Sequence, residues 1–205
     1  MSNYNEHPVF VELKQRFENT MLVEQNGVPL VFIPKTRDRN YSLLTTIGMS
    51  DFEMPVPEKH QERSKIELFF CLPDYWKPEE MENPNHNWVW DRITFMSGFP
   101  KERNTWFGNG HTMPFNREET AISEKFQQEY FFFTDPFELT KEMRPIRQKE
   151  GNIHFIAVVP IFKRELDFKN KAGAHSLLRK FVKKGVSEKV DMFRLCAVRK
   201  RLFFK

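Results

Sequence analysis

The sequence runs Trp-Phe-Gly-Asn-Gly-His-Thr at residues 106–112, directly after an aromatic-rich segment with helical periodicity. Glycine adopts positive φ without a steric cost and lets the backbone approach other groups closely. Two glycines with one residue between them therefore predict a shaped turn at this point. We expect the turn to hold Trp106 and His111 in fixed positions.

Strand-like and helix-like segments lie on both sides of this turn. Alternating or continuous apolar runs predict strands at 28–33, 41–47, 66–72, 130–133 and 153–162. Apolar spacings of three and four residues predict helices at 10–21, 88–99 and 166–184, the last with Gly173 as a candidate break. The unequal spacing of these segments favours an α+β fold, in which helices pack on a sheet, over a regular βαβ winding.

Glycine and proline set the predicted ends of several segments. Asn26-Gly27 is available to end the first helix, and the run 98–100, Gly-Phe-Pro, is expected to end the second one. The prolines within residues 52–62 favour extended backbone and cannot donate to a strand ladder. This stretch is therefore predicted to form an irregular surface arm, while the charged residues 35–40 form a hairpin turn.

The composition indicates one folded domain spanning residues 1–205. Hydrophobic residues make up 40% of the chain and 22 residues are Phe, which is ample material for one core. Cys71 and Cys196 lie far apart and form neither a disulfide framework nor a metal-binding pair, which favours a reducing compartment. The longest apolar run, 153–162, is about half the roughly 20 residues that a membrane helix needs. A soluble, cytoplasmic protein without a membrane partner is expected.

Charge divides the chain into two parts of opposite sign. The formal net charge is +4, but residues 163–205 hold fourteen Lys and Arg against four Asp and Glu. This part therefore carries +10, and residues 1–162 carry −6. Such asymmetry steers charged partners. The last residues, 198–205, mix cations with aromatic side chains, which suits nucleic acid, although a short basic end is more typical of a solvated tail.

Nucleotide-binding and covalent-catalysis motifs are absent from the sequence. A dinucleotide loop would need a third glycine where Met113 stands, and no Gly-x-x-x-x-Gly-Lys-Ser/Thr run occurs. A Gly-x-Ser-x-Gly elbow is also missing. Cys71 lies in a strand pattern that predicts a buried and inert thiol. The sequence therefore excludes these loops and gives no support to a covalent hydrolase.

A metal-assisted hydrolase is the enzymatic alternative to a binding function. Its ligands would be His111 with Asp51 or His154, and His175 is a further histidine that would have to converge with them. No His-Glu-x-x-His spacing supports such a site. Nucleic-acid binding through residues 198–205 is the second alternative.

The candidate partner-binding residues each have a structural interpretation beside the functional one. A histidine such as His111 can donate to a nearby carbonyl and fix a turn, and Trp106 suits the core as well as a binding hot spot. Asp51 follows a glycine kink and can cap a turn. In the functional interpretation, Asp51 and Glu53 form an acidic lip beside the turn, where a basic partner docks. The candidate set is Asp51, Glu53, Trp106, Asn109 and His111.

Several further stretches, taken with residues 106–112, resemble one known family. These stretches are 46–51 followed by 55–57, 67–73, 153–168 and 173–178. In content and order they resemble the bacterial single-domain branch of the suppressor-of-fused (SUFU-like) domain family, over residues 45–191. The basic C-terminal tail, 192–205, lies outside the resemblance.

The resemblance implies a suppressor-of-fused-like α/β sandwich with a mixed, largely antiparallel central β-sheet and packed helices. It also implies a non-catalytic protein-binding module without a cofactor. Eukaryotic relatives hold a peptide of a transcription factor as an added strand, and an acidic residue stands in their pattern where this chain has Gly110. Bacterial relatives are implied to be immunity proteins, which neutralise a polymorphic toxin encoded nearby. The acidic residues 1–162 would suit a basic toxin.

Overall fold

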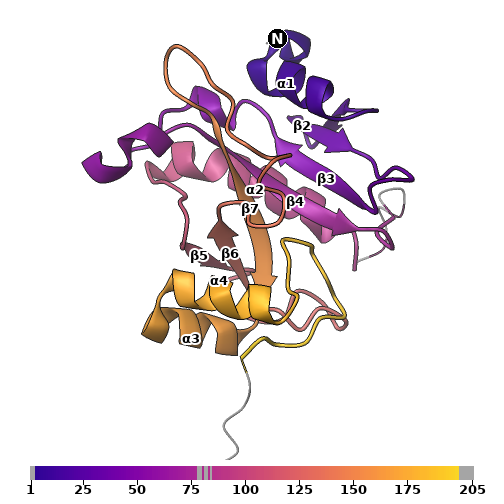
Figure 1. Cartoon of the computed structure of the whole chain (residues 1–205), viewed down its shortest axis with the longest axis vertical. Coiled ribbons are helices and arrows are strands. Elements are labelled where there is room, and N and C mark those ends of the chain that lie inside the picture. The colour runs from indigo at the N-terminus through magenta and orange to yellow at the C-terminus, as the bar shows by residue number, and fades with distance from the viewer. Residues whose placement is uncertain (1–2, 78–79, 81–82, 84, 199–205) are drawn as a thin grey trace, which may run out of the picture.

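A computed structural model describes residues 3–77, 80, 83 and 85–198, and the strands in this part form one sheet with the order β1-β2-β3-β4-β7-β6-β5 (Figure 1). The strands are β1 (Met21–Gln25), β2 (Val28–Ile33), β3 (Tyr41–Thr46), β4 (Ile66–Pro73), β5 (Thr112–Pro114), β6 (Tyr130–Thr134) and β7 (His154–Ile161). The α-helices are α1 (Pro8–Arg16), α2 (Trp88–Arg103), α3 (Lys163–Ala172) and α4 (Ala174–Lys183). Short 3₁₀ helices occupy Tyr4–Glu6, Met49–Asp51 and Glu58–Arg63.

The sheet is mixed because one central pair of strands is parallel. Strands β4 and β7 run side by side in the same direction, with Ile66 opposite His154, while the other neighbouring strands are antiparallel. Parallel strands need a long crossover connection, and here this connection contains α2, β5 and β6. The predicted α+β fold with a mixed, largely antiparallel sheet is confirmed, and so is the hairpin of β2 and β3.

Helices cover both faces of the sheet, and each face has its own apolar cluster. On β4, Phe69 and Cys71 face the cluster under α1, α3 and α4, whereas Phe70 and Leu72 face the cluster under α2. This division follows from the alternation of side chains along a strand. Because β4 is covered on both faces, every one of its residues is buried. Strands of this kind have a nearly continuous apolar sequence. Figure 1 shows α1 at one end of the molecule and the α3–α4 pair at the other.

The first predicted helix is too long, because its last part belongs to a strand. Helix α1 ends at Arg16, and Met21 begins β1. The pair Asn26-Gly27 ends no helix. It turns the chain from β1 into β2, with φ of 52° at Asn26 and 77° at Gly27. Two-residue hairpin turns of this type require positive φ at both positions and favour Asn-Gly.

The second predicted helix is too short, because α2 continues through Pro100 to Arg103. A proline inside a helix removes its own backbone donor and crowds the carbonyl four residues before it. Here the buried side chains of Val89, Ile93 and Met96 hold the helix on the sheet before that point. The helix ends where Asn104 adopts the left-handed conformation, with φ of 46°. The predicted break at Gly173 is correct, since this residue separates α3 from α4 with φ of 87°.

Two segments that the sequence assigns to the surface are anchored to the core. In the arm 52–62, Met54 is 2% exposed and its sulfur accepts a hydrogen bond from the Phe107 N–H, at 3.5 Å. In the predicted tail 192–205, Arg194 forms a buried ion pair with Glu165 at 2.7 Å. The arm is therefore not confined to the surface, and Arg194 anchors part of the predicted tail to the core. Residues 199–205, which carry most of the predicted nucleic-acid motif, lie outside the described part.

Among the described residues, no helix combines the length and the apolar character that a membrane crossing requires.

Candidate functional site

Strand β5 forms one open edge of the sheet. Hydrogen bonds from Phe133 N–H to His111 C=O, at 2.9 Å, and from Phe115 N–H to Glu129 C=O, at 2.8 Å, define the register with β6. In an antiparallel pair, successive residues direct their backbone groups alternately toward the partner strand and away from it. The outward groups of β5 are therefore the Thr112 N–H and C=O and the Pro114 C=O, because proline has no N–H.

The turn at 106–111 leads directly into β5. The Gly110 N–H donates to the Phe133 C=O at 2.8 Å, and Gly110 has φ of 93°, a conformation that side chains strongly disfavour. Trp106 folds back over Gly108, where an added Cβ would lie only 2.3 Å from a ring carbon of Trp106. The predicted shaped turn is present, and Gly108 is needed because of this close approach.

Trp106 and His111 meet in this turn, and His60 of the arm adds a third ring. The ring centroids of Trp106 and His111 are 4.2 Å apart, and those of Trp106 and His60 are 5.5 Å apart. Burial lowers the pKa of His111, although a hydrogen bond to the Trp106 backbone acts in the opposite direction. Nearby Lys169 and His60 lower the pKa further by charge repulsion. His111 is therefore neutral at pH 7 and is held against the turn.

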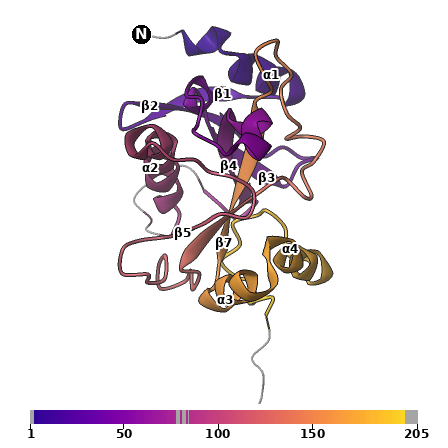
Figure 2. The same cartoon turned by 90° about the vertical axis from the view of Figure 1, so that its left-hand side faces the viewer.

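A groove of about 910 Å³ is lined by residues of α2, β5 and α3. Figure 2 shows β5 between these two helices. Its apolar lining is aromatic and includes Phe95, which is 47% exposed, and Phe99, which stacks on Phe107. The charged residues of the lining are Arg92, Arg103, Arg117, Lys169 and Glu118. Thus cations outnumber carboxylates in the groove by four to one.

The candidate residues identified from the sequence fall into separate groups. Trp106 and His111 line the groove. Asn109 is exposed, and its side-chain amide donates to Asp135 at 3.0 Å, which ties the turn to the end of β6. Asp51 and Glu53 are not part of the groove lining.

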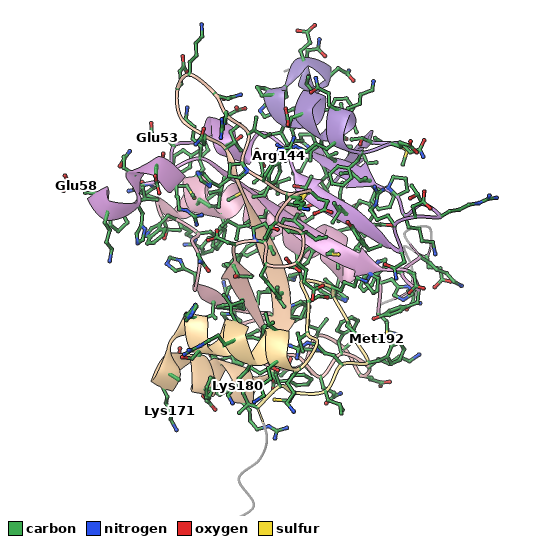
Figure 3. All side chains as sticks on the ribbon, in the orientation of Figure 1. Glu53, Glu58, Arg144, Lys171, Lys180 and Met192 are labelled. Atoms are coloured by element: carbon green, nitrogen blue, oxygen red, sulfur yellow. The ribbon has the colours of Figure 1, made fainter. Side chains whose placement is uncertain are left out.

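The two acidic candidates are engaged with their own surroundings. The Asp51 carboxylate lies 3.2 Å from His7 Nε2, beside the start of α1. Glu53 accepts hydrogen bonds from Gln61 at 3.1 Å and from Ser64 at 3.2 Å, within the arm. Figure 3 shows Glu53 and Glu58 on this arm, at the side of the molecule. Among the described residues, no hydrogen bond or ion pair links Asp51 or Glu53 to a residue that lines the groove.

The histidines proposed as metal ligands are also dispersed. His154 stands at the start of β7, where burial lowers its pKa, and His175 is exposed at the start of α4. Within the described ranges, no three His, Cys, Asp or Glu side chains lie close enough together to hold an ion. Cys71 is 1% exposed, as predicted, and burial strongly raises the pKa of its thiol.

Sequence reasoning missed the α2 wall of the groove and its charge. Arg92, Phe95, Phe99 and Arg103 follow one another at steps of three and four residues, so they share one stripe of the helix. The apolar spacing at 88–99 predicts only a helix, and in the structure Ile93 and Met96 on the neighbouring stripe are buried in the core. Two Phe residues with an Arg at each end of the stripe are the signal that separates a groove wall from a core face.

Comparison with known proteins places the fold. A putative SUFU homolog from Neisseria gonorrhoeae is similar over 98% of this chain and 100% of its own, with a TM-score of 0.64 and 15% identity. The Sufu–Fu complex contains a chain that is similar over 92% of this chain and 90% of its own, with a TM-score of 0.66 and 15% identity. Drosophila Suppressor of Fused matches 82% of this chain and 42% of its own, with a TM-score of 0.58 and 15% identity.

The sequence matches none of the curated proteins with which it was compared. Residues 24–195 match the family described as suppressor of fused protein (SUFU). This span is wider than the predicted 45–191, because it also includes the end of β1, all of β2 and the start of β3. The chain belongs to the suppressor of fused protein (SUFU) family.

Proposed function

We propose that the chain is a protein-binding domain that takes up an extended segment of its partner along the open edge of β5. The observation that carries this proposal is the groove beside β5, where outward backbone groups border exposed aromatic side chains. Extended peptides bind such edges by adding a strand, with main-chain hydrogen bonds for affinity and side-chain pockets for specificity. The presence of a related chain in the Sufu–Fu complex supports a binding role for this fold.

The chemistry of the edge favours selective pairing. Pro114 leaves the edge without a second donor, and prolines on edge strands reduce unspecific pairing with other sheets. Thr112 keeps both its N–H and its C=O for a partner strand. A bound segment would therefore be centred on Thr112, with Trp106 and His111 at one end of the groove.

Within this proposal, the partner is a toxin encoded nearby and the chain is its immunity protein, as the resemblance to bacterial relatives implies. Neutralisation of this kind requires an occluding interface of about 1,200–2,000 Å² and no bond-making groups. The hydrogen bond between the His111 side chain and the Trp106 backbone supports a structural role for this histidine in the turn. A cytoplasmic location is part of the proposal, because the partner is met inside the producing cell.

Co-expression with the product of the adjacent reading frame tests the immunity assignment. We expect the chain to rescue growth and to form a 1:1 complex with that product. If neither rescue nor a complex is found, the immunity assignment is wrong, while a binding role toward another protein is then sought by affinity capture.

The Thr112→Pro substitution tests the site itself. It removes the outward N–H of β5 but none of the hydrogen bonds between β5 and β6. We expect partner affinity to fall at least about tenfold with an unchanged melting temperature. Thr112→Val keeps the N–H and is the matched control. Equal binding by both variants would show that the partner docks elsewhere.

A further inference from the structure

We infer that the segment received by β5 is acidic: an extended peptide in which carboxylates alternate with apolar side chains. This inference rests on the proposed function, because it names the partner chemistry of the same groove. The groove is positively charged, whereas residues 1–162 as a whole carry a net charge of −6.

The cations of the groove are left without carboxylate partners. In the described part of the chain, Arg92, Arg103, Arg117 and Lys169 form no ion pair. Elsewhere the protein does pair its arginines, for example Arg194 with Glu165 at 2.7 Å and Arg63 with Asp135 at 2.6 Å. The lining of the groove therefore holds four cations, and its one carboxylate, Glu118, forms no ion pair with any of them.

Arg92 carries an unsatisfied hydrogen-bond donor at the wall of the groove. Its guanidinium donates to the Phe115 C=O at 3.1 Å and lies 4.9 Å from the centre of the Phe115 ring. These contacts fix the planar group at the groove wall, yet its Nε is buried without a hydrogen-bond partner. A guanidinium with a free donor in a fixed position is suited to a carboxylate.

Lys169 supplies a cation from the opposite wall. Burial lowers the pKa of Lys169, and no carboxylate counteracts this effect. A carboxylate brought in by a partner would compensate for the lost hydration of the ammonium group.

The arrangement of these cations fits an extended strand. Arg92 and Arg103 belong to α2, Lys169 belongs to α3, and β5 lies between these two helices (Figure 2). Successive side chains of a strand point to opposite faces. A strand added to β5 would thus direct its side chains alternately toward α2 and α3, and carboxylates on either face would meet a cation.

The apolar lining and the sheet edge favour a peptide over a nucleic acid. The ring centroids of Phe95 and Phe99 are 5.5 Å apart, and the two rings form an aromatic surface between the cations. The outward C=O groups of Thr112 and Pro114 are acceptors, which would repel phosphate oxygens but accept hydrogen bonds from a peptide backbone. The groove therefore suits an extended peptide whose carboxylates meet the cations and whose apolar side chains meet the aromatic lining.

A pair of labelled peptides tests the inference by fluorescence anisotropy. Both have about nine residues, slightly more than a typical strand, and share the same alternating Val and Phe. One carries Glu at the other positions and the second carries Lys. We expect the Glu peptide to bind at least about tenfold more tightly than the Lys peptide, and added salt to weaken this preference.

A charge-reversal pair of variants locates the effect. In Arg103→Glu/Arg117→Glu, both changes are at exposed positions of the groove, and we expect the preference for the Glu peptide to be lost or reversed. In the control Arg37→Glu/Arg147→Glu, the same change of net charge is made at exposed positions outside the groove, and we expect the preference to remain. An equal loss in both variants would mean general attraction and would overturn the inference.

The remaining outcomes separate the two proposals. Tighter binding of the Lys peptide, abolished by Thr112→Pro, would overturn the acidic partner but keep the binding site on β5. Failure of both peptides to bind at concentrations up to about 1 mM would overturn the inference of an acidic segment. The effect of Thr112→Pro on the complex with the natural partner would then show whether β5 is the binding site. Displacement of the Glu peptide by an oligothymidine at lower concentration than by unlabelled peptide would assign the groove to nucleic acid instead.

Discussion

His111 links the fold to the site at the scale of single residues. Its backbone C=O is part of the β5–β6 ladder, its ring packs on Trp106, and it lines the groove. The sequence could indicate that this histidine occupies a shaped turn, because glycine spacing carries that information. It could not indicate that Lys169 and His60, which are distant in sequence, stand close enough to affect the pKa of His111.

The lowered pKa of His111 predicts a loss of stability in acid. The unfolded chain takes up the proton near the ordinary pKa of 6.5, whereas the folded chain resists it. The unfolded state thus binds more protons in this range, so the free energy of unfolding falls as the pH drops below 6.5, until the folded pKa is reached. In His111→Gln this part of the decrease is expected to disappear, while the side chain can still donate to the Trp106 backbone.

Urea unfolding between pH 7.5 and pH 5 measures this effect as a free energy of unfolding, with the pH interval set by the histidine range. His175→Gln, at an exposed position, is the control and should retain the wild-type decrease. If His111→Gln also retains the full decrease, then His111 does not contribute to it.

At the scale of elements, local patterns predict the buried strands and fail where tertiary contacts set the boundaries. Strand β4 is apolar except for Glu67, and the sequence pattern predicts it correctly. Met21 fits the helical spacing of α1, but pairing with Phe32 places it in β1. Pro100 is a stop signal that α2 passes through. The cations of the groove went unrecognised because their significance depends on an absence of partners, which only the folded chain reveals.

The segment after α4 is an element that sequence patterns did not predict. It has no regular structure, yet Glu188 accepts backbone hydrogen bonds from residues 137–139, and Ala197 N–H donates to Glu165 at 2.7 Å. Glu165 is completely buried, and it also accepts from the N–H of Phe162 at the start of α3. One buried carboxylate therefore joins this segment to a helix.

Arg194→Met is predicted to destabilise the protein strongly, because it leaves the buried Glu165 charge without its partner. The expected loss in the free energy of unfolding is about 3–5 kcal/mol. Glu165→Gln/Arg194→Met removes both charges and should recover part of that loss, which a double-mutant cycle in urea quantifies. Lys171→Met, a change at an exposed lysine that points away from α3 (Figure 3), is the neutral control. A loss below about 1 kcal/mol in Arg194→Met, as for surface ion pairs, would contradict the prediction.

At the scale of the whole molecule, the sheet joins two apolar clusters into one structure. The buried tryptophans Trp76, Trp88 and Trp90 all belong to the cluster under α2, and Trp106 packs against that cluster. Leu177 of α4 is completely buried in the other cluster, across the sheet. Because β4 and β7 contribute side chains to both clusters, we propose that residues 3–198 unfold as a single cooperative domain.

Leu177→Ala therefore has a predictable effect on distant tryptophans. The substitution should cost about 2–5 kcal/mol, and the urea midpoint measured by tryptophan fluorescence should fall by the same amount as the midpoint measured by far-ultraviolet circular dichroism. Val182→Ala, at a 65% exposed position of the same helix, should leave both midpoints in place. If Leu177→Ala lowers the dichroism midpoint but not the fluorescence midpoint, the two faces of the sheet unfold separately. Coincident shifts would instead mean that binding energy gained at β5 stabilises α3 and α4 as well as α2.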